Sequence, residues 1–141
     1  MATNEGIAAF RAAIEAIKEE ARATMADAVE RGADRLVSTA QLTCPVNDLE
    51  KHPGELRNSI KKIPGSHELM RRVTVDAQDE KGHYFAAHVE FGHMTKGRHV
   101  AAHPFFYPAW RLVRSRVKGQ IQRGIKAAVE KQRAAPAPVN E

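Results

Sequence analysis

Four of the chain's seven histidines lie close together in the sequence, at His88, His93, His99 and His103. Imidazole is a common metal ligand and a general base near neutral pH. A zincin site, however, needs H-E-x-x-H on one helix, and the chain instead reads H-V-E-F-G-H from His88 to His93. The H-x-E of zinc deaminases needs two further cysteine ligands, and Cys44 is the only cysteine. We therefore expect no metal and no other cofactor, and we place these histidines on surfaces and loops.

Motifs for nucleophilic catalysis and phosphate binding are also missing from the sequence. Neither Ser38 nor Ser59 lies in a G-x-S-x-G context, and Cys44 directly precedes a proline. No G-x-x-x-x-G-K-[ST] loop and no strand-borne G-x-G-x-x-G loop occurs. A single cysteine also excludes an intrachain disulfide. The sequence therefore predicts a protein that is not an enzyme.

The net charge of +5 is concentrated at the C-terminal end. Residues 1–40 carry 5 Lys/Arg against 7 Asp/Glu, residues 41–103 carry 9 against 8, and residues 104–141 carry 8 against 2. Such a basic segment can face DNA or an acidic protein, or it can be the solvated side of an ordinary helix. The aromatic residues fall at expected core positions rather than between the cations, so base stacking is not indicated. No apolar run approaches the roughly 20 residues that span a bilayer, and we expect a soluble protein.

The first third of the chain reads as one long amphipathic helix over residues 1–43. Apolar residues recur there at steps of three and four, beginning with Ile7, Phe10 and Ile14. The Cys44-Pro45 pair ends the pattern, because the residue before proline is disfavoured in helical space. A helix of this length cannot be buried by so small a domain, so part of it should pack on something else.

The middle of the chain, residues 56–91, is predicted to form antiparallel strands. Three candidate strands cover residues 56–63, 68–77 and 83–91, with turns between them. In the last of these, the odd positions from Phe85 to Phe91 alternate with polar or small residues, which predicts one buried face. Residues 92–103 contain two glycines and several cationic side chains, which is typical of an extended loop or hairpin arm.

A C-terminal helix is predicted over residues 104–133, with prolines in its first turn and a disordered tail at 134–141. The predicted fold is a single α+β domain over residues 1–133. It consists of the long N-terminal helix, a small antiparallel sheet of about three to four strands, and the C-terminal helix packed on that sheet. Four cations of the last helix, Arg111, Arg114, Lys118 and Arg123, form a possible face toward DNA or an acidic partner.

Two segments together resemble a known family. One is C-P-V followed by G-E-L-R-N-S-I at residues 54–60, and the other is Y-F-A-A-H-V-E-F-G at 84–92 followed by A-H-P-F-F-Y-P-A at 102–109. In this order they resemble the neck proteins of long-tailed bacteriophages and prophages, the head-to-tail joining or tail-completion family. His93 stands where that family usually has threonine, and the spacer at 47–53 is longer than usual. The residues that carry the resemblance are Pro45, Gly54, Leu56, Ser59, Ile60, Tyr84, Phe91, Pro104, Phe105 and Pro108.

The resemblance implies a non-enzymatic component of the virion neck or tail, made in the cytoplasm of the bacterial host. Such a protein would assemble with itself as a ring that joins the DNA-filled head connector to the tail tube, or that completes the tail. Its implied neighbours are a head-closure or connector protein, a tail terminator and the tail tube protein, with possible non-specific contact to DNA in the channel. Two alternatives remain open: a tail terminator that caps the tube, and a small basic DNA-associated protein.

The predicted subunit interface lies at the arm. Glu90 and Gly92 precede the flexible basic loop that carries Lys96, Arg98 and His99. A charged residue and a basic loop beside an otherwise apolar strand suit contact with an adjacent subunit. We therefore expect these five residues to meet a neighbouring copy.

Overall fold

The computed structural model describes residues 4–47 and 53–135. Two long helices account for half of the chain, and short helices and strands lie between them. The elements in chain order are α1 (Asn4–Thr43), α2 (Glu55–Asn58), β1 (Ile60–Pro64), β2 (Arg71–Val75), α3 (Ala86–Phe91), β3 (His93–Thr95), β4 (Arg98–Val100) and α4 (Phe106–Ala134). The predicted disordered tail falls largely outside the described residues, as do residues 1–3 of the predicted first helix.

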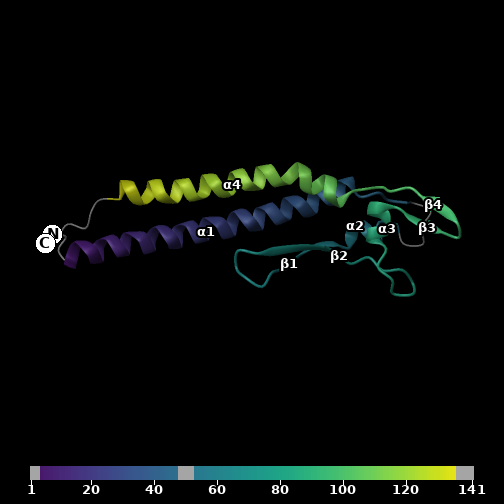
Figure 1. Cartoon of the computed structure of the whole chain (residues 1–141), viewed down its shortest axis with the longest axis horizontal. Coiled ribbons are helices and arrows are strands. Elements are labelled where there is room, and N and C mark those ends of the chain that lie inside the picture. Colours follow the sequence, from purple (N-terminus) through teal and green to yellow (C-terminus); the bar gives the residue numbers. More distant parts are fainter. Residues whose placement is uncertain (1–3, 48–52, 136–141) are drawn as a thin grey trace.

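Helices α1 and α4 lie side by side and antiparallel, and they form the long body of the molecule (Figure 1). Small residues let the two backbones approach closely. A Cβ at Gly32 of α1 would lie 2.9 Å from both Cγ atoms of Val117 on α4, and Gly124 of α4 lies in the same way against Thr24 of α1. The seam is therefore built from glycines that face side chains on the opposite helix.

The strands form two separate antiparallel hairpins rather than one sheet. In the first, β1 pairs with β2 from Ile60 opposite Val75 to Pro64 opposite Arg71. In the second, β3 pairs with β4 from His93 opposite Val100 to Thr95 opposite Arg98. Figure 1 shows β1 and β2 on the side of α1 that is opposite α4, and β3 and β4 at the end of the molecule where α1 ends and α4 begins.

Ionic contacts hold the first hairpin to α1. Lys62 of β1 contacts both Glu30 and Asp34, the latter at 2.6 Å, and Arg71 of β2 also contacts Glu30. The Nε2 of Gln41 donates a hydrogen bond to the carbonyl of Ile60 at 3.3 Å. Hydrogen bonds from Lys62 and Arg71 lower the pKa of Glu30 below its ordinary value. Hydrogen bonds to Asp34 and Glu30 raise the pKa of Lys62.

The core lies where the C-terminal half of α1, the α2–β1 segment and the first turns of α4 meet. Phe105 and Ile60 are the largest side chains in it, at 1% and 2% exposed. The remaining buried members are Leu36, Ala40, Cys44, Leu56, Ala77, Ala109 and Val113. The structure confirms the predicted α+β class, in which the start of α4 packs on β-strand residues and the rest of α4 follows α1.

The predicted strand over 83–91 is wrong, and the predicted strand over 56–63 is wrong in its first residues. Residues 86–91 form the short helix α3, and residues 55–58 form the helical turn α2, where the sequence predicted strands over 83–91 and 56–63. In α3 the half-buried Phe85 and Val89 are four residues apart, and Glu90 is buried, which is a helical rather than an alternating pattern. The adjacent alanines at 86 and 87 also favour a helix. Phe91, predicted on the core face, is 66% exposed.

The first turns of α1 project beyond α4. The ion pair between Lys131 and Glu20, at 3.0 Å, lies near the end of α4. Before this point Ile7, Phe10 and Ile14 are 42%, 67% and 46% exposed, although they continue the stripe that faces α4 further along. The exposure of these residues agrees with the expectation that part of this helix packs on something outside the chain, which remains a prediction. No helix among the described residues has an apolar stretch that could span a membrane.

Candidate interaction surfaces

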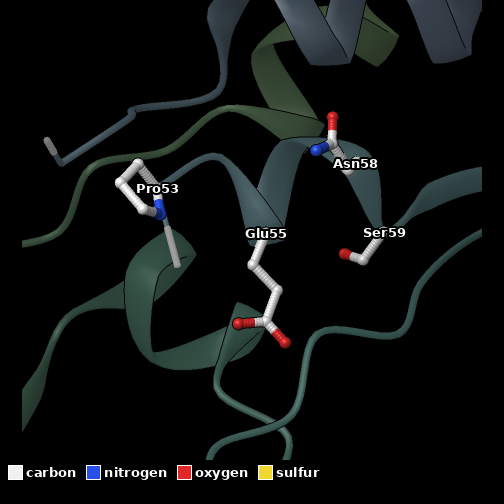
Figure 2. Close-up of a pocket in the computed structure, with 4 residues that line it drawn as sticks. All are labelled: Pro53, Glu55, Asn58 and Ser59. Atoms are coloured by element: carbon white, nitrogen blue, oxygen red, sulfur yellow. The ribbon is translucent and has the colours of Figure 1, made fainter. Parts of the chain in front are cut away.

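The hollow beside α2 has no catalytic arrangement. It is about 590 Å³ in volume and is lined by Pro53, Glu55, Asn58 and Ser59. Figure 2 shows that the side chains of Glu55 and Asn58 point to opposite sides of α2. The hydroxyl of Ser59 donates to the carbonyl of Leu56 at 2.7 Å. The described residues that line the hollow therefore include no nucleophile paired with a base.

The histidines of the described residues are not gathered into one site. The rings of His88 and His93 stack with centroids 4.8 Å apart, while His83 contacts Asp79 at 3.2 Å in a separate turn. His99 lies on β4, and the backbone N–H of His103 donates to the carbonyl of Val89 at 2.8 Å. Among the residues that the structure describes, no group of three or more His, Cys, Asp or Glu side chains could hold a metal ion.

Cys44 is buried within the core, and burial raises the pKa of its thiol. The thiolate is the nucleophilic form of cysteine, so burial makes the side chain unreactive. Cys44 therefore acts as a small apolar core residue.

Glu90 has an intramolecular role that the sequence did not predict. Its side chain is only 6% exposed, and its carboxylate accepts hydrogen bonds from the backbone N–H groups of Phe105, Phe106 and Tyr107 at 2.8, 3.0 and 3.0 Å. These are the first free donors of α4, and the next residue, Pro108, has no N–H. Glu90, which lies on α3, therefore accepts hydrogen bonds from every free backbone N–H at the start of α4. Its side chain is not on the surface of the isolated chain.

A signal for this cap is present in the sequence. The residue at the N-cap position of α4 is Phe105, which makes no side-chain capping bond. No Ser, Thr, Asp or Asn stands directly before the helix, so its first N–H groups needed an acceptor from elsewhere. Nothing local, however, shows that this acceptor is Glu90.

Gly92 sets the base of the arm, which we define as residues 92–103. Its φ is +72°, and a Cβ there would lie 2.7 Å from the carbonyl oxygen of Val100. Lys96 and Gly97, with φ of +46° and +73°, form the two-residue turn that joins β3 to β4. Residues 92–103 are therefore a hairpin arm, as predicted.

The predicted interface residues of the arm project into solvent. Lys96, Arg98 and His99 are all exposed, and Met94 is 65% exposed. Contact of these residues with an adjacent subunit remains a prediction, since the structure contains one chain. Of the five residues predicted there, Glu90 is buried and Gly92 shapes the backbone.

Exposed aromatic side chains lie next to the arm. The rings of Phe91 and Tyr107 are 5.8 Å apart, and these side chains are 66% and 49% exposed. Tyr107 and Trp110, which is 41% exposed, also line a groove of about 470 Å³ whose floor includes Leu36 and Val117. Large exposed aromatic and apolar surfaces of this kind mark sites of protein contact.

The four predicted cations of α4 do not share one face. Arg114 and Lys118 line a hollow on one flank of the helix, and Arg111 is exposed on the neighbouring turn. Arg123 instead lines a small hollow with Asp27 and Arg31 of α1, on the other flank. The predicted basic face is therefore formed by Arg111, Arg114 and Lys118 without Arg123.

The motif residues divide into core and surface. Leu56, Ile60 and Phe105 are buried, and Gly54 has the positive φ of +80° that starts α2. Ser59 and Pro108 are half-buried. The exposed members are Pro45, Tyr84, Phe91 and Pro104.

Comparison with known proteins gives one match. The family model HK97-gp10-like, described as "Bacteriophage HK97-gp10, putative tail-component", matches residues 8–92. This covers more than half of the chain, from α1 through α3, and ends at Gly92, the first residue of the arm. No curated protein and no solved structure gives a significant match.

Proposed function

Because the chain belongs to the HK97-gp10-like family of phage tail-associated structural components, we propose that it assembles as a ring at the neck of a tailed bacteriophage particle. There it joins the DNA-filled head connector to the tail tube, or completes the tail. The match over residues 8–92 carries this proposal. A structural tail component is not an enzyme, and its family associates the chain with the virion.

The shape of the single chain supports assembly with neighbours. The first turns of α1 project past α4 with Ile7 and Phe10 exposed, and the arm projects at the opposite end of the molecule (Figure 1). Surfaces at two different places on one chain suit a heterologous contact, in which one patch meets a different patch on the next copy. Such contacts close into rings when the rotation allows it.

The neighbours in this proposal are a head-closure or connector protein, the tail terminator and the tail tube protein. The exposed Phe91, Tyr107 and Trp110 offer the aromatic anchors that commonly carry binding energy at such contacts.

Electron microscopy of particles that lack this gene tests the proposal. Separate DNA-filled heads and complete tails are the expected result. Overlong tails would instead indicate a tail terminator that caps the tube. Normal, infectious particles would contradict both assignments, and salt-sensitive DNA binding by the purified protein would then favour a DNA-associated role.

A further inference from the structure

The two helices of the body carry opposite charges on their outer faces. On α1, acidic side chains recur at steps of four and eleven along the side away from α4, at Glu15, Glu19, Glu30 and Asp34. We call this set the acidic stripe. Alanines at positions 8, 12, 16 and 23 lie on the same side, so few bulky side chains shield it.

On α4, cations occupy the side away from α1. Arg111, Arg114, Lys118, Lys126 and Arg133 are spaced three, four, eight and seven residues apart, which keeps them on one side of the helix. We call this set the basic stripe. Within the described part of the chain, only Lys126 has an ion-pair partner, which is Glu130 at 4.0 Å. The other four cations of the stripe are exposed.

The chain itself shows what the acidic stripe binds. Where the β1–β2 hairpin covers α1, Lys62 and Arg71 contact Glu30, and Lys62 also contacts Asp34. The side chain of Glu68, in the turn between β1 and β2, contacts Arg22 of α1 at 3.2 Å, and the exposed Glu15 and Glu19 lie before that point in the helix. Among the described residues the ion pair of Glu15 is with Lys18 of the same helix, at 3.4 Å. The N-terminal half of the stripe therefore presents carboxylates that no other element covers.

We propose that the basic stripe of one copy docks on the N-terminal half of the acidic stripe of the next copy. This inference rests on the proposed ring, because it supplies the contact that repeats around it. The spacing agrees: Glu15 and Glu19 are four residues apart on α1, as are Arg114 and Lys118 on α4. Because the two stripes lie on opposite sides of one helical hairpin, each copy can bind one neighbour on each side.

The charges set orientation and register more than they set affinity. Exposed ion pairs contribute little individually, whereas like charges brought together across an interface are strongly unfavourable. Duplex DNA is the competing occupant of the basic stripe, since phosphates would also bind it. If DNA bound the basic stripe, the acidic stripe of α1 would have no partner. Docking between copies gives both stripes a partner.

A charge-swap experiment tests the proposal in particles. Arg114→Glu with Lys118→Glu reverses the basic stripe, and Glu15→Lys with Glu19→Lys reverses the acidic one. Supplied to particles that lack the gene, each pair alone is expected to lower the yield of joined particles about tenfold or more. The chain carrying all four substitutions is expected to recover the yield, because every contact is complementary again.

A matched control separates this contact from net charge. Arg116→Glu with Arg123→Glu changes the net charge by the same amount on the other flank of α4, and it is expected to leave the yield unchanged. Circular dichroism checks that every variant is folded. Binding of a short DNA duplex by the purified variants is measured in parallel.

Three results would overturn the docking. The yield could be unaffected by either reversal, it could fall with both and fail to recover in the combined variant, or it could fall in step with lost DNA binding. In each case the phenotype of particles that lack the gene still tests the proposed function. That phenotype does not depend on which surfaces of neighbouring copies meet. Normal particles without the gene would reject the proposed function instead.

Discussion

Glu90 shows how one buried carboxylate can join two parts of this chain. It lies on α3, and it accepts all three available N–H groups at the start of α4, 15 to 17 residues further along. The positive end of the helix dipole also favours a carboxylate at this place. A residue that the sequence placed at a subunit interface therefore holds the fold together, and changes to it act first on stability.

Replacing Glu90 tests this role. Glu90→Ala is expected to lower the free energy of unfolding by about 2 kcal/mol or more, because it leaves buried N–H groups without an acceptor. Thermal unfolding followed by circular dichroism measures the loss. Glu19→Ala, which removes an exposed carboxylate, serves as the control and should leave the midpoint unchanged. Equal midpoints for the two variants would show that the cap does not contribute.

The contacts of Glu30 predict a dependence of stability on pH. Hydrogen bonds from Lys62 and Arg71 lower the pKa of Glu30 in the folded chain below its ordinary value of 4.5. A carboxylate with a lowered pKa stabilises the fold above its unfolded pKa, and this stabilisation is lost as the pH falls through the folded pKa. The wild type should therefore exceed Glu30→Gln in stability near neutral pH, and this difference should disappear below the folded pKa.

Chemical denaturation of both chains at a series of pH values measures the difference. The Glu15→Gln variant, on the uncovered part of the same helix, controls for loss of charge on α1. A difference between wild type and Glu30→Gln that stays constant through the acidic range would contradict the linkage.

At the scale of elements, the sequence predicts the long helices well and the short segments poorly. The periodic apolar stripes of α1 and α4 extend over many turns, so their type is clear from spacing alone. Residues 83–91 form a short apolar run that fits both a strand and a helix, and contacts with Phe105 and Ala77 decided the outcome. The division of the strands into two hairpins also depends on contacts that spacing does not show.

The same limit applies to the candidate surfaces. The turn at Lys96-Gly97 and the exposed arm follow from local residue types, so they could be predicted. The separation of Arg123 from Arg114 follows from their spacing, because nine residues place them on opposite sides of a helix. The burial of Glu90 depends on how α3 packs against the start of α4. This tertiary contact could not be read from the sequence.

The close seam between α1 and α4 predicts opposite effects for two glycines. Gly32→Ala places a Cβ against Val117, and this overpacking is expected to cost about 1–3 kcal/mol, more than the roughly 1 kcal/mol gained in helix propensity. Gly119→Ala meets only the far end of the Arg123 side chain, at 3.2 Å, so it should stabilise the chain by about 0.5–1 kcal/mol. Urea unfolding compares the two.

Val117→Ala provides a further check on Gly32. In the Val117→Ala background, Gly32→Ala should lose most of its cost, because the opposing methyl groups are gone. Equal costs in both backgrounds would mean that the helices are not in contact at this point.

At the scale of the whole molecule, some exposed side chains at the two ends and on the outer faces have no role in the fold of a single chain. Ile7, Phe10 and Ile14 are exposed at one end, and the arm with Phe91 is exposed at the other. Neither stabilises the isolated chain, whereas both suit a component completed by its neighbours. Membership of the HK97-gp10-like family gives these surfaces a context in the phage tail.

The arm can be tested separately from the fold. Replacing Lys96, Arg98 and His99 by serine should leave thermal stability unchanged, because all three side chains are exposed. Particles supplied with this variant should show a loss of joined heads and tails of about tenfold, since the arm is proposed to contact an adjacent subunit. Replacing Arg116 and Arg123 by serine, on the flank of α4 outside the basic stripe, controls for the loss of positive charge. Full particle yield with the serine variant would exclude the arm from the interface.

A reconstruction of the head–tail junction of purified particles by electron cryo-microscopy tests the central claim most directly. The account predicts a closed ring of copies of this chain between the head connector and the tail tube, with α4 of each copy facing α1 of the next. A junction whose density is fully accounted for by other proteins, with this chain absent from the particle, would contradict it.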